Sequence, residues 1–328
     1  MAESTPRSDD HQTATAGGTY EFARDVAVGL TDTPRWLPCQ YLYDAEGSRL
    51  FEEITRQPEY YPTRTEAAIL EAAAGAIAER TRSVSLIELG SGSSRKTSLL
   101  LDAYTAAFES VTYVPVDVSE AAIRGAEQRF AELHPEVEFA GIVGRYEEAF
   151  SLFREHSPAM VMFLGSTIGN FNHGESLRFW RQVARALEPG DFFLLGVDLV
   201  KDRTVLEAAY NDAAGVTPRF TRNLFERMNR ELDAGVDVDA IEHVARYNDE
   251  WQRIEIFARF TATQLVRVGP LDLQIPVAAG ETVMTEISRK FVLDHLEPYV
   301  RLFGFDVVAR YADERNWFGV LLLQRGSG

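Results

Sequence analysis

The sequence predicts an α/β protein with a doubly wound sheet and a second domain built from the N-terminal segment and an insertion. The prediction depends on two observations. Between residues 64 and 200, apolar strand-like runs alternate with helix-like runs, which is typical of parallel strands joined by crossover helices. Between about 201 and 290 the alternation stops, and a long helical stretch is followed by a period-two pattern of polar and apolar residues. That pattern predicts an inserted helix plus an antiparallel hairpin.

The elements of the parallel sheet follow in a regular order. A helix over 64–81 is expected first, and then strands over 83–90, 110–118, 137–144, 159–164 and 191–200. Helices are expected over 97–108, 119–134 and 174–190, the last ending at a glycine. After residue 290, one more helix and two strands separated by a polar turn are expected.

Three regions are expected from these boundaries. Residues 1–18 are polar and lack the apolar segment of a signal peptide, so they are expected to form a disordered tail. Residues 19–64 are rich in Pro and Tyr, and we expect them to join 201–290 in a cap domain. Residues 65–200 and 291–328 are expected to form the core that contains the sheet.

Composition excludes several classes of function. The chain has 33 Lys and Arg against 50 Asp and Glu, and a net charge of -17 disfavours binding to nucleic acids or anionic membranes. No apolar run approaches the roughly 20 residues that span a bilayer. A single cysteine, Cys39, excludes an internal disulfide. We therefore expect a cytoplasmic protein that acts on a small molecule. A monomer is expected.

The histidines give little support to a metal site or a hydrolase. Their spacing contains no H-x-x-x-H or H-E-x-x-H pattern, and the sequence has no G-x-S-x-G motif. His243 is expected to have a structural role in the hairpin region. No metal is expected.

A glycine pair follows the first predicted strand in "LIELGSGSSRKTSLLL". Gly90 and Gly92 allow a tight turn and a close approach of the backbone to a ligand, although an ordinary strand-to-helix turn needs the same residues. Arg95 stands where the dinucleotide fingerprint has its third glycine, which disfavours a dinucleotide. Asp117 ends the second strand, where an acidic residue accepts hydrogen bonds from ribose hydroxyls. These residues favour a ribose-containing cofactor.

Two further features lie near the same turn. Glu88 precedes the glycines in "IELGSGSS", an arrangement that resembles class I S-adenosylmethionine methyltransferases, but an ordinary carboxylate at a strand end would give the same pattern. Asn170 ends the loop "FLGSTIGN" after the fourth strand, and its amide can donate to a carboxylate and accept from an amine. An Asn at a turn or a helix cap is the alternative.

Taken together, several sequence blocks resemble the ergothioneine-pathway histidine Nα-methyltransferases. The resemblance covers nearly everything from about residue 20 to the end. It implies a class I S-adenosylmethionine-dependent methyltransferase fold, S-adenosyl-L-methionine as cofactor and L-histidine as substrate, trimethylated on its α-amino group to hercynine. It also implies that the cap of 19–64 plus 201–290 binds the substrate and that the core of 65–200 plus 291–328 binds the cofactor. The blocks are "LYDAEGSRLFEEITRQPEYYPTRTE", "IELGSGSSRKT", "FLGSTIGN", "LGVDLVKD", "AAYNDAAGVT", "FTRNLFERMNREL" and "MTEISRKF".

The resemblance implies roles for residues at the cofactor. Gly90 and Lys96 match cofactor-binding positions in the first turn, and Asp117 matches the acidic residue at the ribose. The family has an Asp-aromatic pair at the adenine, where this chain has Arg145 and Tyr146. Arg145 cannot accept a hydrogen bond from the adenine amino group, whereas the Tyr146 ring can flank the adenine.

The departure at Arg145 leaves two explanations open. Either the adenine is held by backbone atoms or by Glu147 or Glu148, or the alignment shifts at this point.

The resemblance also implies a substrate site. Glu286 and Ser288 alternate in a predicted strand, so they share one face, and an imidazole has one N–H to donate and one nitrogen to accept. Without the resemblance, "TEIS" would be a solvated strand face and the tyrosines core aromatics. Tyr60, Asn170 and Tyr210 match residues around the backbone of the amino acid, Glu286 and Ser288 those that hold the imidazole, Tyr43 a tyrosine near the reacting amine and Phe51 a pocket wall. Tyr43 is therefore the candidate catalytic residue, which would assist loss of the amine proton; a water chain or uptake of the neutral amine are the alternatives.

Two other functions remain open from the sequence. Nα-methylation of another amino acid such as tryptophan is one, because Ile256 replaces a longer side chain at the pocket; the Glu286 and Ser288 pair favours histidine, since indole offers one donor and no acceptor. A non-catalytic nucleotide-binding protein or a dehydrogenase is the other. The missing third glycine disfavours the dehydrogenase.

Overall fold

The chain crosses three times between two compact units in the computed structural model, which describes residues 9–90, 95–118 and 120–327. The first unit is formed by residues 1–60 and 203–287, and the second by residues 61–202 and 288–328. The sequence placed the corresponding boundaries at 64, 200 and 290.

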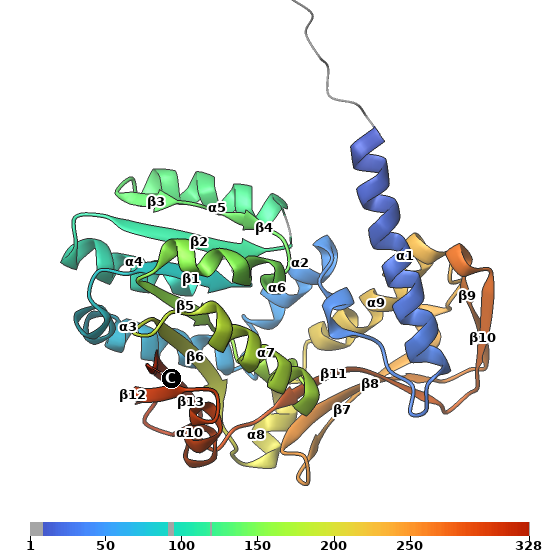
Figure 1. Ribbon diagram of the computed structural model, residues 1–328. Helices are drawn as coiled ribbons and strands as arrows, with labels where there is room; N and C mark the ends of the chain where they lie inside the picture. Colours follow the sequence, from blue (N-terminus) through green and yellow to red (C-terminus); the bar gives the residue numbers. More distant parts are fainter. Residues whose placement is uncertain (1–8, 91–94, 119, 328) are drawn as a thin grey trace, which may run out of the picture. The chain divides into compact units, whose positions relative to one another are not determined.

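The second unit contains a mixed sheet in the order β12-β13-β6-β5-β1-β2-β3, and β4 also pairs with β2 (Figure 1). Neighbouring strands from β3 to β6 pair in parallel, and β13 is antiparallel to both β6 and β12. This is an α/β fold with a mixed, Rossmann-like sheet, and the α/β class was predicted from the sequence. The strands are β1 Ser85–Leu89, β2 Val111–Asp117, β3 Val137–Phe139, β4 Ile142–Val143, β5 Ala159–Phe163, β6 Phe192–Asp198, β12 Phe305–Ala312 and β13 Phe318–Arg325.

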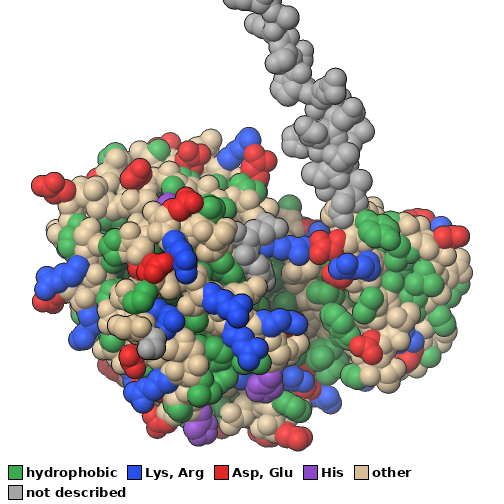
Figure 2. Space-filling view, in the orientation of Figure 1, with side chains coloured by type: hydrophobic (Ala, Val, Ile, Leu, Met, Phe, Trp, Pro, Cys, Tyr) green, Lys and Arg blue, Asp and Glu red, His purple; other side chains and the backbone are tan. Residues whose placement is uncertain are grey.

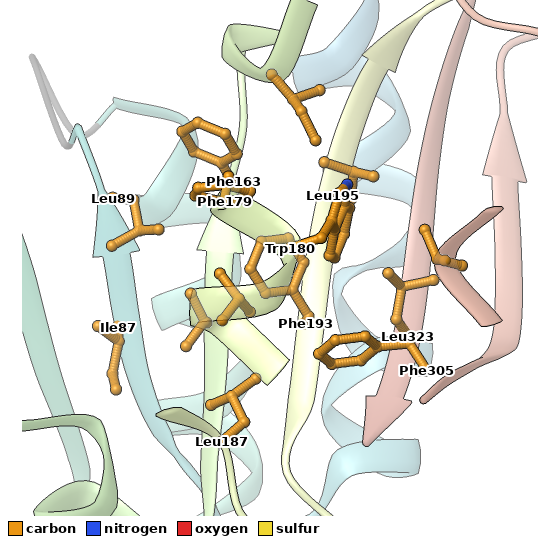
Figure 3. Close-up of a cluster of buried hydrophobic side chains, with 14 of the residues drawn as sticks. Ile87, Leu89, Phe163, Phe179, Trp180, Leu187, Phe193, Leu195, Phe305 and Leu323 are labelled. Carbon is orange, nitrogen blue, oxygen red and sulfur yellow. The ribbon is translucent and has the colours of Figure 1, made fainter. Parts of the chain in front are cut away.

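Helices bury both faces of this sheet, which explains why its central strands are apolar without alternation. Successive strand residues point to opposite faces, so Ile87 and Leu89 join one core and Leu86 the other. In the first core, Phe179 and Trp180 of α7 pack against strand residues such as Phe193 (Figure 3). The helices of this unit are α3 Pro62–Thr81, α4 Arg95–Ala107, α5 Glu120–Leu133, α6 Tyr146–Ala149, η2 Phe150–His156, η3 Thr167–Asn170, α7 His173–Ala186 and α10 Leu293–Arg301.

The strand predicted over 137–144 is two short strands, β3 and β4, with an irregular link between them. At Gly141, which lies in this link, a Cβ would approach the Ile123 side chain to 2.6 Å. The Ala140 N–H donates to Tyr113 O, whereas the next ladder contact joins Ile142 to Val116. The interruption thus lies at a glycine that has no room for a side chain.

In the first unit, α1 (Asp9–Thr31) already includes residues 9–18, which the sequence assigned to a disordered tail. The later part of α1 explains the helix, because Phe22, Ala23, Val26 and Leu30 are buried at helical spacing. A helix anchored in this way propagates at low cost toward its N-terminus. Residues 1–8 lie outside the described part of the chain.

The long helix predicted after residue 202 is two helices, α8 (Arg203–Ala208) and α9 (Val216–Leu232). Between them, Gly215 has a φ of 69°, and the Asp212 carboxylate accepts from the N–H groups of Val216 and Thr217 at 2.6 and 2.7 Å. An acidic side chain that satisfies the first N–H groups of a helix starts that helix, so the break has a local cause.

The inserted β region contains more than the predicted hairpin. A sheet has the order β11-β8-β7, and a separate antiparallel pair joins β9 to β10. His243 lies in β7, where its ring contacts Thr221 Oγ1 at 2.8 Å and Tyr210 O at 2.9 Å, in keeping with the structural role expected. The elements are η1 Cys39–Leu42, α2 Ala45–Ile54, η4 Val238–Ala240, β7 Ile241–Asn248, β8 Arg253–Phe260, β9 Gln264–Val268, η5 Gly269–Leu271, β10 Leu273–Val277 and β11 Thr282–Arg289, whose last residues belong to the second unit.

Within the described ranges, every helix is too short or too polar to cross a membrane. Charged side chains of both signs are scattered over the visible face of the molecule (Figure 2). Many charged side chains of the described residues are paired, as Arg310 is with Asp294 and Glu297.

Candidate functional site

The carboxyl ends of β1 and β2 bring Gly90 and Asp117 together at one edge of the sheet. Leu89 pairs with Val116, and the Gly90 N–H donates to Val116 O at 2.9 Å. Gly90 has a φ of 71°, the left-handed region that favours glycine, and Asp117 is half-buried. Gly92 lies outside the described residues. In an open parallel sheet, this edge is where ligands bind.

Lys96 lies near this edge on α4 and forms an ion pair with the fully buried Glu66 of α3. The Glu66 carboxylate also accepts from the Gly165 N–H, at 2.8 and 2.9 Å from its two oxygens. A side chain at Gly196 of β6 would overlap Glu66 Oε1. Glu66 therefore joins two helices to the loop after β5, and the sequence analysis assigned it no role.

Tyr146 begins α6 and lies against an aromatic part of the core. Its ring centroid is 6.0 to 6.4 Å from those of Phe150, Phe163, Phe171 and Phe179. The side chain is half-buried, so the ring is held by packing. The side chains of Glu147 and Glu148 lie outside the described residues, and Arg145 has no role that the geometry distinguishes.

Four of the predicted substrate residues meet in the first unit. Tyr43 contacts Phe51 with ring centroids 5.6 Å apart, Phe51 contacts Tyr60 at 6.2 Å, and Tyr60 contacts Tyr210 at 6.0 Å. Phe220 of α9 completes this aromatic cluster, at 5.3 Å from Tyr43 and 6.2 Å from Phe51. The sequence analysis missed Phe220, although it stands in the quoted block "FTRNLFERMNREL".

Glu286 and Ser288 occupy alternate positions of β11, as predicted. Glu286 is half-buried and Ser288 is buried, at 4% exposure. In the second unit, Asn170 ends η3, and this loop lies against the end of β11, because a Cβ at Gly169 would be 2.9 Å from Arg289 O. The structure thus places the "STIGN" loop against the last residue of β11 within the second unit.

A family model described as "Histidine-specific methyltransferase, SAM-dependent" matches residues 22–325. The chain belongs to this family. A histidine N-alpha-methyltransferase from Mycolicibacterium smegmatis is 43% identical over 92% of this chain and 94% of its own length. The enzyme of the same name from Mycobacterium tuberculosis is 42% identical over 93% and 95%. Ergothioneine biosynthesis protein 1 of Neurospora crassa is 30% identical over 90% of this chain and 34% of its own length.

In this methyltransferase, a buried charge cluster lies at the end of β6. Asp198 accepts from the Tyr61 hydroxyl, 2.8 Å from each carboxylate oxygen, and pairs with both Lys201 and Lys290. Lys290 also donates to Ser288 Oγ at 2.8 Å. Asp198 and Lys201 lie in the block "LGVDLVKD", and Lys290 lies in "MTEISRKF". Of the residues in these two blocks, only Glu286 and Ser288 had a role expected from the sequence.

Glu88 of this methyltransferase is buried near the carboxyl ends of β1 and β2, where Gly90 and Asp117 lie. It accepts from Thr97 Oγ1 at 2.6 Å and from the Tyr113 hydroxyl. Burial raises the pKa of Glu88 to about 7, although both hydrogen bonds oppose the rise. Burial therefore favours the protonated, uncharged form of this carboxyl.

The raised pKa of Glu88 predicts a pH-dependent stability. Between pH 4.5 and about 7 the folded protein keeps a proton that the unfolded chain releases, so stability is fully present below pH 4.5 and falls as pH rises through 7. The loss attributable to Glu88 is roughly 3 kcal/mol. Glu88→Gln is expected to reduce the change of the unfolding free energy with pH between pH 5 and 8, measured by urea unfolding. Glu79→Gln, on the exposed side of α3, is the control. An identical change of the unfolding free energy with pH in wild type and Glu88→Gln would contradict the prediction.

The Tyr43 hydroxyl is held in its neutral form in this methyltransferase. Burial raises the pKa of Tyr43 well above its usual value, and the Glu286 carboxylate acts in the same direction. The residue as a whole is 36% exposed, so the burial concerns its hydroxyl end. A neutral phenol accepts a hydrogen bond from an amine through its oxygen but is a poor proton acceptor.

No group of three or more His, Cys, Asp or Glu side chains suited to a metal ion is found among the described residues.

Proposed function

We propose that the protein methylates the α-amino group of L-histidine three times with S-adenosyl-L-methionine, giving hercynine, a step of ergothioneine biosynthesis. The observation that carries this proposal is the pair Glu286 and Ser288 at alternate positions of β11, in a chain that belongs to the histidine-specific methyltransferases. The mycobacterial relatives are histidine N-alpha-methyltransferases, and the Neurospora relative is an ergothioneine biosynthesis protein.

The residues at the carboxyl edge of the second unit fit S-adenosylmethionine. Asp117 would accept from the ribose hydroxyls, Gly90 would allow the backbone to approach, and the Tyr146 ring would flank the adenine. Lys96 is 22% exposed, and an ammonium has three donors, so it can bind an anionic group of the cofactor while it stays paired with Glu66. When bound, the cofactor supplies a sulfonium methyl group as the electrophile.

We infer that the first unit is a substrate-binding domain. It carries the aromatic cluster of Tyr43, Phe51, Tyr60, Tyr210 and Phe220. Aromatic faces stabilise a cation such as the trimethylammonium product, and their rigid packing excludes water from the amine. We propose that the protein is a monomer, which size-exclusion chromatography with light scattering tests.

The remaining roles concern the two ends of histidine. Tyr60, Tyr210 and Asn170 would bind the α-amino and carboxylate groups, and Glu286 and Ser288 the imidazole. Catalysis then comes mainly from alignment of the amine, since methyl transfer needs no nucleophilic side chain. Because Tyr43 is neutral, its part is to accept a hydrogen bond from the amine and orient the nitrogen lone pair.

The test is a substrate panel. The protein is incubated with S-adenosylmethionine and each of the common amino acids, and products are identified by mass spectrometry. Histidine is expected to gain three methyl groups, and the unfolding temperature is expected to rise with S-adenosylhomocysteine but not with NAD. Methylation of tryptophan in place of histidine would support the alternative substrate, and the absence of any methyl transfer would overturn the proposal.

A further inference from the structure

Helix α7 has two faces of opposite character. Its inner face packs in the core through buried residues such as Phe179 and Trp180. Its outer face carries Arg178, Arg181 and Arg185, which are all exposed. Positions three and four apart are neighbours on a helix, so these three side chains form a single arginine stripe. In the view of Figure 2, several Lys and Arg side chains lie over this helix.

The arginine stripe forms no ion pair among the residues that the structure describes. The acidic residues at the two ends of the helix are engaged elsewhere. Glu175 accepts from the Asn172 N–H at 2.7 Å, and Glu188 pairs with Arg154 of η2 at 3.0 Å. Like charges at this spacing disfavour a helix. In a chain with a net charge of -17, the stripe is therefore a concentration of positive charge that the fold itself does not use.

An open hollow of about 440 Å³ adjoins the end of the arginine stripe, between η2 and α7. Arg154 joins the two elements, because its guanidinium donates to Arg185 O at 3.0 Å. Arg154, Arg185 and Gln182 supply hydrogen-bond donors to the lining of the hollow. Phe150 and Ala186 supply apolar surface. A ligand that fits this lining combines negative charge with an apolar group.

The hollow lies away from the carboxyl edge of the sheet. η2 and α7 end shortly before β5 and β6 begin, so the hollow lies toward the amino ends of these strands. Gly90 and Asp117 lie at the carboxyl ends of β1 and β2, and β1, β2, β5 and β6 are parallel. S-adenosylmethionine carries a net positive charge and histidine is a zwitterion, so neither proposed reactant accounts for an arginine stripe.

The charge and length of the arginine stripe indicate the chemistry of its partner. Guanidinium groups bind carboxylates through pairs of parallel hydrogen bonds, so an acidic partner fits the stripe. From Arg178 to Arg185 the helix rises about 10 Å, which roughly three residues of an extended chain would span. A nucleic acid carries continuous negative charge and would be repelled by the rest of this acidic chain.

We propose that the arginine stripe and the hollow form a docking surface for an acidic segment of a partner protein. Carboxylates of the segment pair with Arg178, Arg181 and Arg185, and one apolar side chain of the segment enters the hollow against Phe150 and Ala186. The surface includes none of the residues proposed to bind the cofactor or histidine, so docking is compatible with methyl transfer.

Binding of a synthetic acidic peptide tests the proposal. The probe is a fluorescein-labelled decapeptide with a central phenylalanine between runs of glutamate, titrated with the protein and followed by fluorescence anisotropy. Binding is expected to weaken roughly 10-fold as NaCl rises from about 50 to about 200 mM, because salt screens exposed charges. Replacing the phenylalanine with glycine is expected to weaken binding roughly 5-fold. Absence of binding at low salt, or equal binding of the glycine peptide, would overturn the proposal.

Charge reversal tests where the peptide binds. Arg178→Glu, Arg181→Glu and Arg185→Glu are each expected to weaken peptide binding roughly 5- to 10-fold. Arg80→Glu is the matched control, because Arg80 is exposed and its helix, α3, packs on the opposite face of the sheet from α7. Its expected effect is less than about 2-fold. Equal losses in Arg80→Glu and in the stripe variants would show an effect of net charge alone and overturn the proposal.

The same variants separate docking from catalysis. Circular dichroism verifies that each one is folded, and methyl transfer to histidine is expected to be unchanged in all of them. Because peptide binding is measured without the cofactor or histidine, its result does not depend on the proposed function.

Two other occupants of this surface would give different results. Pyrophosphate at about 1 mM and constant ionic strength is expected to leave the peptide bound, and its displacement would assign the hollow to small anions and overturn the proposal. Light scattering detects a second copy of the chain as the occupant. An oligomer of the unmodified protein that Arg181→Glu converts to a monomer would overturn the proposal as well.

Discussion

Replacing Glu286 with alanine is expected to raise the KM for histidine roughly 100-fold, since a charge-assisted hydrogen bond to the ring N–H is lost. Glu286 is half-buried on β11, and its charge reaches the Tyr43 hydroxyl in the aromatic cluster. The kcat should fall less than kcat/KM, because the imidazole is remote from the transferred methyl group. Steady-state kinetics at saturating S-adenosylmethionine measure both parameters.

The matched control for Glu286→Ala is Glu242→Ala, in the same sheet. Glu242 lies on β7, is 47% exposed and pairs with Arg259, so its removal is expected to leave the histidine KM within about 2-fold of wild type. The Glu286→Ala variant should also discriminate less between histidine and tryptophan than wild type does. An unchanged histidine KM in Glu286→Ala would remove Glu286 from the substrate site.

The parallel sheet was predictable because its central strands carry an unambiguous signal. β5 and β6 are buried at every position, so their apolar runs stand out against the amphipathic helices between them. The breaks between β3 and β4 and between α8 and α9 were not predictable. Gly141 leaves no room for a side chain beside Ile123, and the Asp212 carboxylate accepts from a backbone N–H at the start of α9. A glycine or an aspartate in the sequence does not by itself show that a strand or helix breaks there.

The candidate site was predictable to the extent that its residues follow strand geometry. Gly90 and Asp117 end neighbouring strands, and Glu286 and Ser288 obey the period of two along β11. Residue type and periodicity therefore predict where these residues lie on their strands. The resemblance to a known family was needed for their roles, because a glycine turn or a polar strand face has many uses.

The buried charges could not be predicted from periodicity. Tyr61 and Asp198 are 137 positions apart, and Glu66 and Gly165 are 99 apart, yet each pair is in hydrogen-bond contact. A charged residue in a sequence is normally exposed, since burial without a partner is costly. Lys96 is an example. Its position matches a cofactor-binding position of the family, but only the structure shows that its ammonium is paired with Glu66.

The buried charge cluster makes Asp198 the position where the largest loss of stability is expected. Asp198→Ala would leave Lys290 and Lys201, whose side chains are 0% and 5% exposed, without their carboxylate, and would deprive Tyr61 of its acceptor. Removing one partner of a buried ion pair costs roughly 3–5 kcal/mol, because the remaining charge stays buried and uncompensated.

Urea unfolding of Asp198→Ala, Asp198→Asn and Asp294→Ala measures this cost. Asp294 pairs with Arg310 at the surface of the same unit and is 83% exposed, so its removal is expected to cost less than about 1 kcal/mol. Asp198→Asn keeps two hydrogen-bonding atoms but loses the charge, so its loss should lie between the other two. A loss in Asp198→Ala as small as that in Asp294→Ala would contradict the prediction.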